Sequence, residues 1–120
     1  MATELAETTQ AVERTILDYF LGWFEGDAAR MESALHPGLA KRTLRDGELQ
    51  SLTAAQMIEA TAAGSGRRFG SDERRIEIVV TNVDRGYASA VVHSDVYIEY
   101  LHLAETADGW KIVNALWQFT

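Results

Sequence analysis

The second half of the chain constrains the fold more than any other part of the sequence. Four segments there are typical of β-strands, and short links containing Gly, Asn, Asp or Ser separate them: residues 75–81, 87–93, 97–105 and 110–119. Such links join antiparallel neighbours, because a parallel connection needs a crossover of about a dozen residues or more. This half therefore predicts a four-stranded antiparallel meander.

The first half has the pattern of a broken helix. Apolar residues recur at separations of three, four and seven, the period of an amphipathic helix: Leu5, Val12, Ile16, Tyr19, Phe20 and Trp23. Gly26 suits the C-terminal cap of this helix, and Asp27 suits the N-cap of a second one. The second helix should end near Leu35, since the residue before Pro37 avoids helical angles.

The middle of the chain predicts a hairpin followed by a third helix. Residues 39–44 and 48–52 flank Asp46-Gly47, a pair that suits a tight turn. Thr53 and Gln56 have the spacing of a capping box, which would open a helix ending near residue 64. Residues 62–72 are rich in Gly and Ser and predict a loop. The class is therefore α+β, with three helices on one face of a curved sheet, in one domain over residues 1–120.

Composition excludes several kinds of site. The chain has no cysteine, so it has no disulfide, thiolate nucleophile or Cys-based metal centre. Its net charge of -7 disfavours nucleic acid and anionic lipid as partners. The three histidines have no ligand spacing and no glycine-rich phosphate loop is present, so we expect no metal and no cofactor. No membrane-length apolar run or signal-peptide pattern is seen, which predicts a cytoplasmic protein without membrane association.

Two stretches resemble a known superfamily. The segments ILDYFLGWFEGDAARMESALHPGLAKR and YIEYLHLAETADGWKIVNALW are similar to nuclear transport factor two-like proteins, in particular to the small bacterial group called putative lumazine-binding and its SnoaL-like and ketosteroid isomerase neighbours. The resemblance implies a cone, in which a bent antiparallel sheet wraps round three helices. It also implies a pocket at the wide end and a homodimer formed through the outer sheet face. Breaking the helix at residues 26–27 would let the second helix fold across the cone and enclose the pocket.

Tyr19 is the first candidate for a ligand contact. It precedes Gly26 by seven residues, and in proteins similar to ketosteroid isomerase a catalytic tyrosine stands at that interval. The positions matching the other two catalytic groups of that enzyme fall at Thr43 and near Leu101, so the resemblance assigns no catalytic residue here. Tyr19 is equally interpretable as a core aromatic with a satisfied hydroxyl.

Three further residues complete the predicted ligand site. Trp23, one turn beyond Tyr19, would form an aromatic wall or simply fill the core. Strict alternation along residues 110–119 sends Asn114 toward the pocket and Trp117 to the outer face, where it would serve a dimer interface. His93 lies beside Asp95 in a group rich in titratable side chains, suited either to acid-base work or to a solvated rim. The basic group of Lys41, Arg42 and Arg45 would be solvated or hold an anion.

Three functions remain open from the sequence. The first is binding of a planar molecule, such as a lumazine-like heterocycle, through Tyr19, Trp23, Asn114 and His93. The second is a SnoaL-like enzyme without cofactor, which needs a base in the pocket and would draw it from these residues: His93, Asp95, Glu99, His36 or Asp27. The third is a protein-interaction domain whose cone is packed shut by aromatic side chains.

Overall fold

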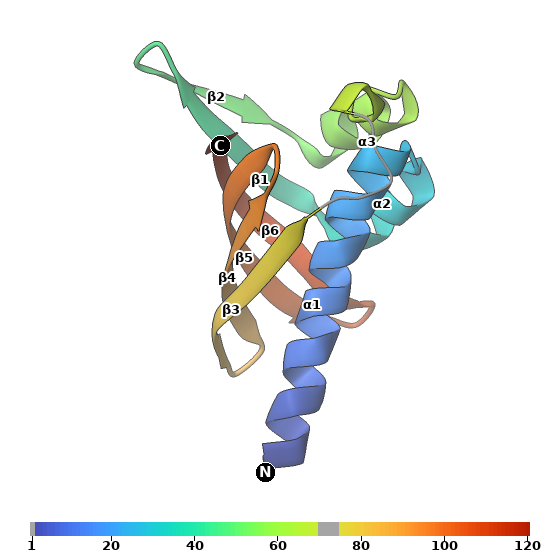
Figure 1. The fold of residues 1–120 in the computed structure, drawn as a ribbon. Helices are drawn as coiled ribbons and strands as arrows, with labels where there is room; N and C mark the ends of the chain where they lie inside the picture. The colour runs from blue at the N-terminus through green and yellow to red at the C-terminus, as the bar shows by residue number, and fades with distance from the viewer. Residues whose placement is uncertain (1, 70–74) are drawn as a thin grey trace.

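The computed structural model describes residues 2–69 and 75–120 and has an α+β fold (Figure 1). The long helix α1 (Ala2–Glu25) lies across one face of a curved sheet, and the shorter helices α2 (Ala28–Ala34) and α3 (Ala54–Ala62) gather near its C-terminal end. A 3-10 turn, η1 (Arg67–Phe69), follows α3. The strands are β1 (Leu35–Arg45), β2 (Glu48–Leu52), β3 (Ile76–Asp84), β4 (Tyr87–Ser94), β5 (Tyr97–Thr106) and β6 (Gly109–Phe119). The predicted class is confirmed.

The predicted break between the first two helices is present and has a local cause. Gly26 adopts a φ of 72°, and the amides of Gly26 and Asp27 donate to Trp23 O and Gly22 O, which closes the end of α1 as a Schellman motif. The Asp27 carboxylate accepts from Arg30 N at 3.1 Å and opens α2. The chain therefore reverses at residues 26–27, and α2 packs beside the last turns of α1.

The other local predictions are also confirmed, with small differences in bounds. Thr53 and Gln56 form the capping box of α3. Asp46 and Gly47, both with positive φ, turn the chain between β1 and β2. β1 begins at Leu35, directly after α2, rather than at residue 39. The predicted loop over residues 62–72 contains η1, and its end lies outside the described residues.

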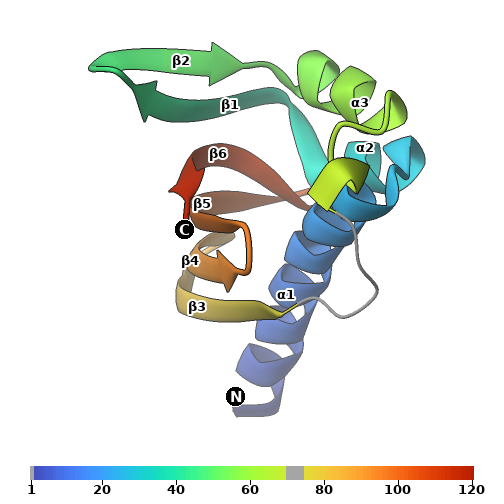
Figure 2. The same cartoon turned by 45° about the horizontal axis from the view of Figure 1, so that its top comes forward.

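The sheet is mixed rather than wholly antiparallel. Its strand order is β2-β1-β6-β5-β4-β3, and β1 runs parallel to β6 while the other neighbours are antiparallel. The β1/β6 pairing joins strands far apart in the sequence, and the short links between consecutive segments do not predict it. Figure 2 shows the β1–β2 hairpin extending beyond the rest of the sheet.

The core lies between α1 and the sheet face that it covers, which we call the inner face. The apolar stripe of α1 is buried there against side chains from the central strands: Val12, Ile16 and Phe20 from the helix, and Val92, Leu101, Leu103 and Ile112 from the strands. The opposite face, which we call the outer face, has no covering element among the described residues.

Candidate functional site

A β-bulge at Val113 decides which side chains of β6 face inward. On the neighbouring strand, Leu103 pairs with Ile112 and His102 pairs with Asn114, so Val113 is an extra residue in β6. Beyond it the alternation is shifted by one position. Two predicted orientations are therefore wrong: Asn114 lies on the outer face, and Trp117 lies on the inner face.

Three polar side chains from three elements meet on the inner face. Tyr19 comes from α1, Lys41 from β1 and Glu99 from β5, and they are only 2%, 8% and 2% exposed. Tyr19 Oη donates a hydrogen bond of 2.8 Å to Glu99 Oε1, and Lys41 Nζ donates to Tyr19 Oη. Lys41 Nζ lies 4.0 Å from Glu99 Oε1. The tyrosine hydroxyl thus links a buried ammonium to a buried carboxylate.

Aromatic rings surround the ammonium of this network. Lys41 Nζ lies 4.9 Å from the ring centroid of Tyr19, 5.5 Å from that of Trp117 and 5.8 Å from that of Trp23. At such distances the ring faces attract a cation. Trp23 Nε1 in turn donates to Tyr97 Oη at 3.0 Å. We call Tyr19, Lys41 and Glu99, with the rings of Trp23, Tyr97 and Trp117, the inner site.

The aromatic layer continues from the inner site toward solvent. The Tyr97 ring is stacked on those of Phe24 and Phe119, at 6.1 and 5.5 Å between centroids. Phe69 from η1 meets it edge-on at 5.7 Å. Phe119 is half exposed, and Trp23 is partly buried. A packed layer of aromatic rings therefore lies between the partly exposed Phe119 and the inner site.

Burial shifts the pKa of each group in the network toward its neutral form. Burial raises the pKa of Glu99, although the Lys41 charge and the Tyr19 hydrogen bond oppose the shift. Burial lowers the pKa of Lys41, and the charge of Glu99 opposes that change. Burial, followed by the charge of Glu99, raises the pKa of Tyr19 well above its ordinary value. Burial therefore acts against the ion pair, while the mutual attraction of Lys41 and Glu99 acts in its favour.

The structure brings together only part of the predicted ligand set. Tyr19 and Trp23 belong to the inner site. His93 is exposed on β4, where it pairs across the sheet with Glu77 and Ile98, and it does not approach Tyr19. Asn114 contacts His102 Nδ1 and Arg42 Nη1, both at 3.4 Å, on the outer face.

The residues predicted as alternative catalytic bases do not lie together in the structure. Glu99 is buried, whereas Asp27 caps α2 and His36 Nδ1 accepts from Gly38 N at 2.9 Å. Asp95 is exposed and accepts from Arg75 N. Of the five residues considered as bases, Glu99 is the one within the inner site.

Sequence reasoning did not include Lys41 in the ligand site and treated it as part of a basic group that is solvated or holds an anion. Alternation would have indicated its orientation, since Leu39, Lys41 and Thr43 are all buried on the inner face of β1. Its partners could not be found in this way, because Tyr19 and Glu99 lie on other elements.

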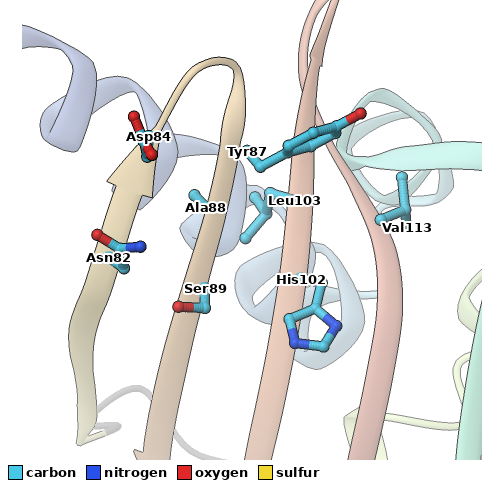
Figure 3. A pocket seen from close by; sticks show the side chains of 8 residues that line it. All are labelled: Asn82, Asp84, Tyr87, Ala88, Ser89, His102, Leu103 and Val113. Atoms are coloured by element: carbon cyan, nitrogen blue, oxygen red, sulfur yellow. The ribbon is translucent and has the colours of Figure 1, made fainter.

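A shallow hollow, separate from the inner site, lies on the outer face (Figure 3). It has a volume of about 440 Å³ and is lined by Asn82, Asp84, Tyr87, Ala88, Ser89, His102, Leu103 and Val113. Tyr87 and His102 project from neighbouring strands, and Ser89 shares a hydrogen bond of 2.7 Å with Thr81. Tyr87, Asn82, Asp84 and His102 are exposed, and no described pair of the lining residues forms an ion pair. The inner site is therefore the stronger candidate for chemistry.

Two kinds of site are not seen in the described part of the chain. No group of three His, Asp or Glu residues is placed to hold a metal ion among residues 2–69 and 75–120. None of the helices described is both long and apolar enough to cross a membrane.

The curved sheet packed over three helices defines a nuclear transport factor two-like (NTF2-like) protein. An NTF2-like protein from Shewanella baltica OS155 matches with a TM-score of 0.81 and 14% identity, over 96% of this chain and 95% of that chain. An NTF2-like protein from Silicibacter pomeroyi DSS-3 has a TM-score of 0.79 and 15% identity, with 100% and 99% covered. The profile of the family described as putative lumazine-binding matches residues 7–118, and the chain belongs to that family.

The structure is also similar to that of a ketosteroid isomerase-like protein from Erwinia carotovora atroseptica. Its TM-score is 0.66 and its identity 12%, over 92% of this chain and 94% of that chain. Identities this low establish a shared fold and nothing more. No curated protein matches the chain significantly. The resemblance noted in the sequence is thus confirmed at the level of superfamily and family.

Proposed function

We propose that the protein binds a small planar molecule at the inner site, with its flat faces against the aromatic layer and its polar edge on Tyr19, Lys41 and Glu99. The observation that carries this proposal is the buried Lys41–Tyr19–Glu99 network. Burying two ionisable groups costs several kcal/mol each, and apolar side chains of similar volume are often as stable or more so. Buried titratable groups with shifted pKa values are typical of functional sites.

The chemistry of the network indicates which ligands fit. Lys41 and Tyr19 carry N–H and O–H donors, and Glu99 carries acceptor oxygens. A planar heterocycle with a carbonyl group next to a ring N–H presents the complementary acceptor and donor. Lumazine, which the family description names, is a molecule of this kind. Asn114 and His93 lie on the outer face and have no part in this site.

Removing Trp23 should weaken binding of such a ligand with little effect on folding. Trp23→Ala is expected to cost about 2 kcal/mol of binding free energy, or roughly thirtyfold in Kd, as is typical of tryptophans at the centre of an interface. The chain has three tryptophans. In a Trp110→Phe background, Trp23 and Trp117 are the remaining fluorophores, so quenching on titration with lumazines, pterins, flavins and steroids reports on the inner site.

Trp110→Phe alone is the matched control. Trp110 is buried beside α1, and Thr15 Oγ1 from the middle of that helix donates to its carbonyl oxygen. The control should bind like wild type. Unchanged affinity in Trp23→Ala, combined with a stability loss of about 3–5 kcal/mol, would assign Trp23 to the core and contradict the proposal.

A second candidate function is acid-base catalysis without a cofactor, and the position of Glu99 favours it. A carboxyl group with a raised pKa is a better base near neutral pH than a surface carboxylate, and Tyr19 and Lys41 would stabilise negative charge developing on a carbonyl oxygen. Any ligand found by quenching should be incubated with the protein and analysed for product. Turnover that is lost in Glu99→Gln, while binding is retained, separates an enzyme from a carrier.

We also propose that the outer face forms a homodimer. It exposes large apolar side chains from five strands: Leu44, Val79, Tyr87, Tyr100 and Leu116. Exposed apolar patches rimmed by polar groups are typical of interfaces. Arg42, Asn114 and His102 lie among these residues and supply polar contacts.

A charge placed in this face should dissociate the dimer. Leu116→Arg is expected to raise the dimer Kd by about two orders of magnitude or more, the effect of burying an unpaired charge. Analytical ultracentrifugation measures the association. Leu5→Arg is the matched control, because Leu5 is 57% exposed on α1, whereas Leu116 is 46% exposed on the outer face. A monomeric wild type, or equal effects of the two substitutions, would contradict the proposal.

A further inference from the structure

The geometry of the inner site points to a covalent role: we infer that the amine of Lys41 condenses with the carbonyl group of a planar aromatic aldehyde or ketone to form a Schiff base. This inference rests on the proposed binding function, since the carbonyl compound must enter the inner site. It assigns Lys41 as the nucleophile, with Tyr19 and Glu99 as the groups that move protons.

The first requirement is an amine that can lose its proton. Lys41 is only 8% exposed, and burial lowers its pKa although the charge of Glu99 and the rings of Tyr19, Trp23 and Trp117 favour the ammonium. Desolvation in an apolar pocket is one of the ways in which lysines are activated as nucleophiles. A carboxylate 4.0 Å away accepts the proton without creating net charge.

The second requirement is a route for that proton. Tyr19 Oη accepts from Lys41 Nζ and donates to Glu99 Oε1, so one hydroxyl links donor and acceptor. Transfer along this chain converts the ammonium and carboxylate into an amine and a carboxylic acid. Burial shifts the pKa of Lys41 down and that of Glu99 up, and both changes favour this neutral pair.

The condensation balances with the groups present. The amine lone pair attacks the carbonyl carbon, a C–N bond forms, and the C=O π electrons move to oxygen. That oxygen takes a proton from Tyr19, which Glu99 restores, and the nitrogen then returns one proton to Glu99. The resulting hydroxyl leaves as water with the Glu99 proton while the nitrogen lone pair forms C=N. The protonated imine faces the Glu99 carboxylate, so one water is released and no oxidant or reductant is consumed.

The sequence provides an internal control for this chemistry. It contains two lysines, Lys41 and Lys111. Lys111 is partly exposed on β6, and its Nζ donates to Ser33 O at 2.6 Å. Lys111 has no described aromatic ring around its ammonium and no described acid partner. A carbonyl probe that distinguishes these two amines therefore reports on the inner site.

The test is reductive trapping of the native protein at neutral pH. The protein is incubated with 2-naphthaldehyde and sodium cyanoborohydride, and peptide mass mapping follows modification at Lys41, Lys111 and the N-terminal amine. Lys41 should react faster than Lys111, because burial lowers the pKa of Lys41 and a lower pKa leaves more free amine at neutral pH. Lys111→Arg should leave this rate unchanged, and Tyr19→Phe should lower it by breaking the proton route.

Binding without reaction is measured separately with 2-naphthalenemethanol, which cannot condense with an amine. A thermal shift with this alcohol in wild type and in Tyr19→Phe reports noncovalent occupancy of the site. If the alcohol stabilises the protein while the aldehyde leaves Lys41 unmodified, the Schiff base is overturned and binding stands. If Lys111 reacts as fast as Lys41, the Schiff base is likewise overturned; the N-terminal amine is mapped only as a reference, since its ordinary pKa is well below that of a lysine. Absence of both the shift and the adduct overturns the binding of planar aromatic molecules as well.

Discussion

The Glu99→Leu variant is expected to lose about 3–5 kcal/mol of unfolding free energy, because it leaves the Lys41 ammonium buried without its counter-charge. The loss is measured as a lower midpoint in urea unfolding with an unchanged m-value. Lys41→Met should also destabilise the protein, because it leaves the Glu99 carboxyl group buried without Lys41. In each single variant the remaining group offsets part of the loss by becoming neutral, since burial lowers the pKa of Lys41 and raises that of Glu99.

The double variant Lys41→Met/Glu99→Leu is the control for this result. Replacing both members of a buried pair by apolar side chains is often neutral or stabilising by about 1–4 kcal/mol. The double variant should therefore regain the stability lost by Glu99→Leu while losing ligand binding and reductive trapping. A loss below about 1 kcal/mol in Glu99→Leu, the size expected for a solvated surface pair, would show that the network is not buried as described.

Gly66→Ala is expected to destabilise the protein by about 1–3 kcal/mol, the usual cost of overpacking, and to disturb the inner site. Gly66 is buried against the end of α1. A Cβ there would overlap the carbonyl oxygen of Trp23 and come within 2.8 Å of its Cδ1. The segment after α3 would have to move away from the helix, taking with it Phe69, which packs on Tyr97.

Two measurements check this prediction. Urea unfolding gives the stability change, and the combined emission of Trp23 and Trp117 in the Trp110→Phe background shows whether the surroundings of the inner site change. Ser65→Ala, one residue earlier in the same segment, adds no atom and should behave like wild type. If Gly66→Ala keeps both wild-type stability and wild-type emission, the close approach of this segment to α1 is not a constraint on the site.

The sequence predicts those features that depend on neighbouring residues. The helix break at Gly26-Asp27, the capping box at Thr53 and the turn at Asp46-Gly47 each require only a few consecutive side chains with the correct backbone preference. The same reasoning gives the α+β class, because the segment types follow from periodicity.

Features that depend on distant strands were not predictable in this way. The bulge at Val113 exists because two residues of β5 oppose three of β6, and nothing within residues 110–119 marks the extra residue. Strict alternation therefore exchanged the faces of Asn114 and Trp117. Lys41 was missed for a related reason, since its burial depends on partners contributed by α1 and β5.

The parallel pairing of β1 with β6 also sets when the inner site can exist during synthesis. Residues 40–42 of β1 align with residues 114–116 of β6, so Lys41 obtains its neighbouring strand only from the C-terminal end of the chain. When α1, α2 and the β1–β2 hairpin have left the ribosome, Lys41 is outside it, whereas Glu99 and Trp117 have not yet emerged. The side chain of Lys41 therefore lacks the partners that bury it until the last strand of the sheet has been made.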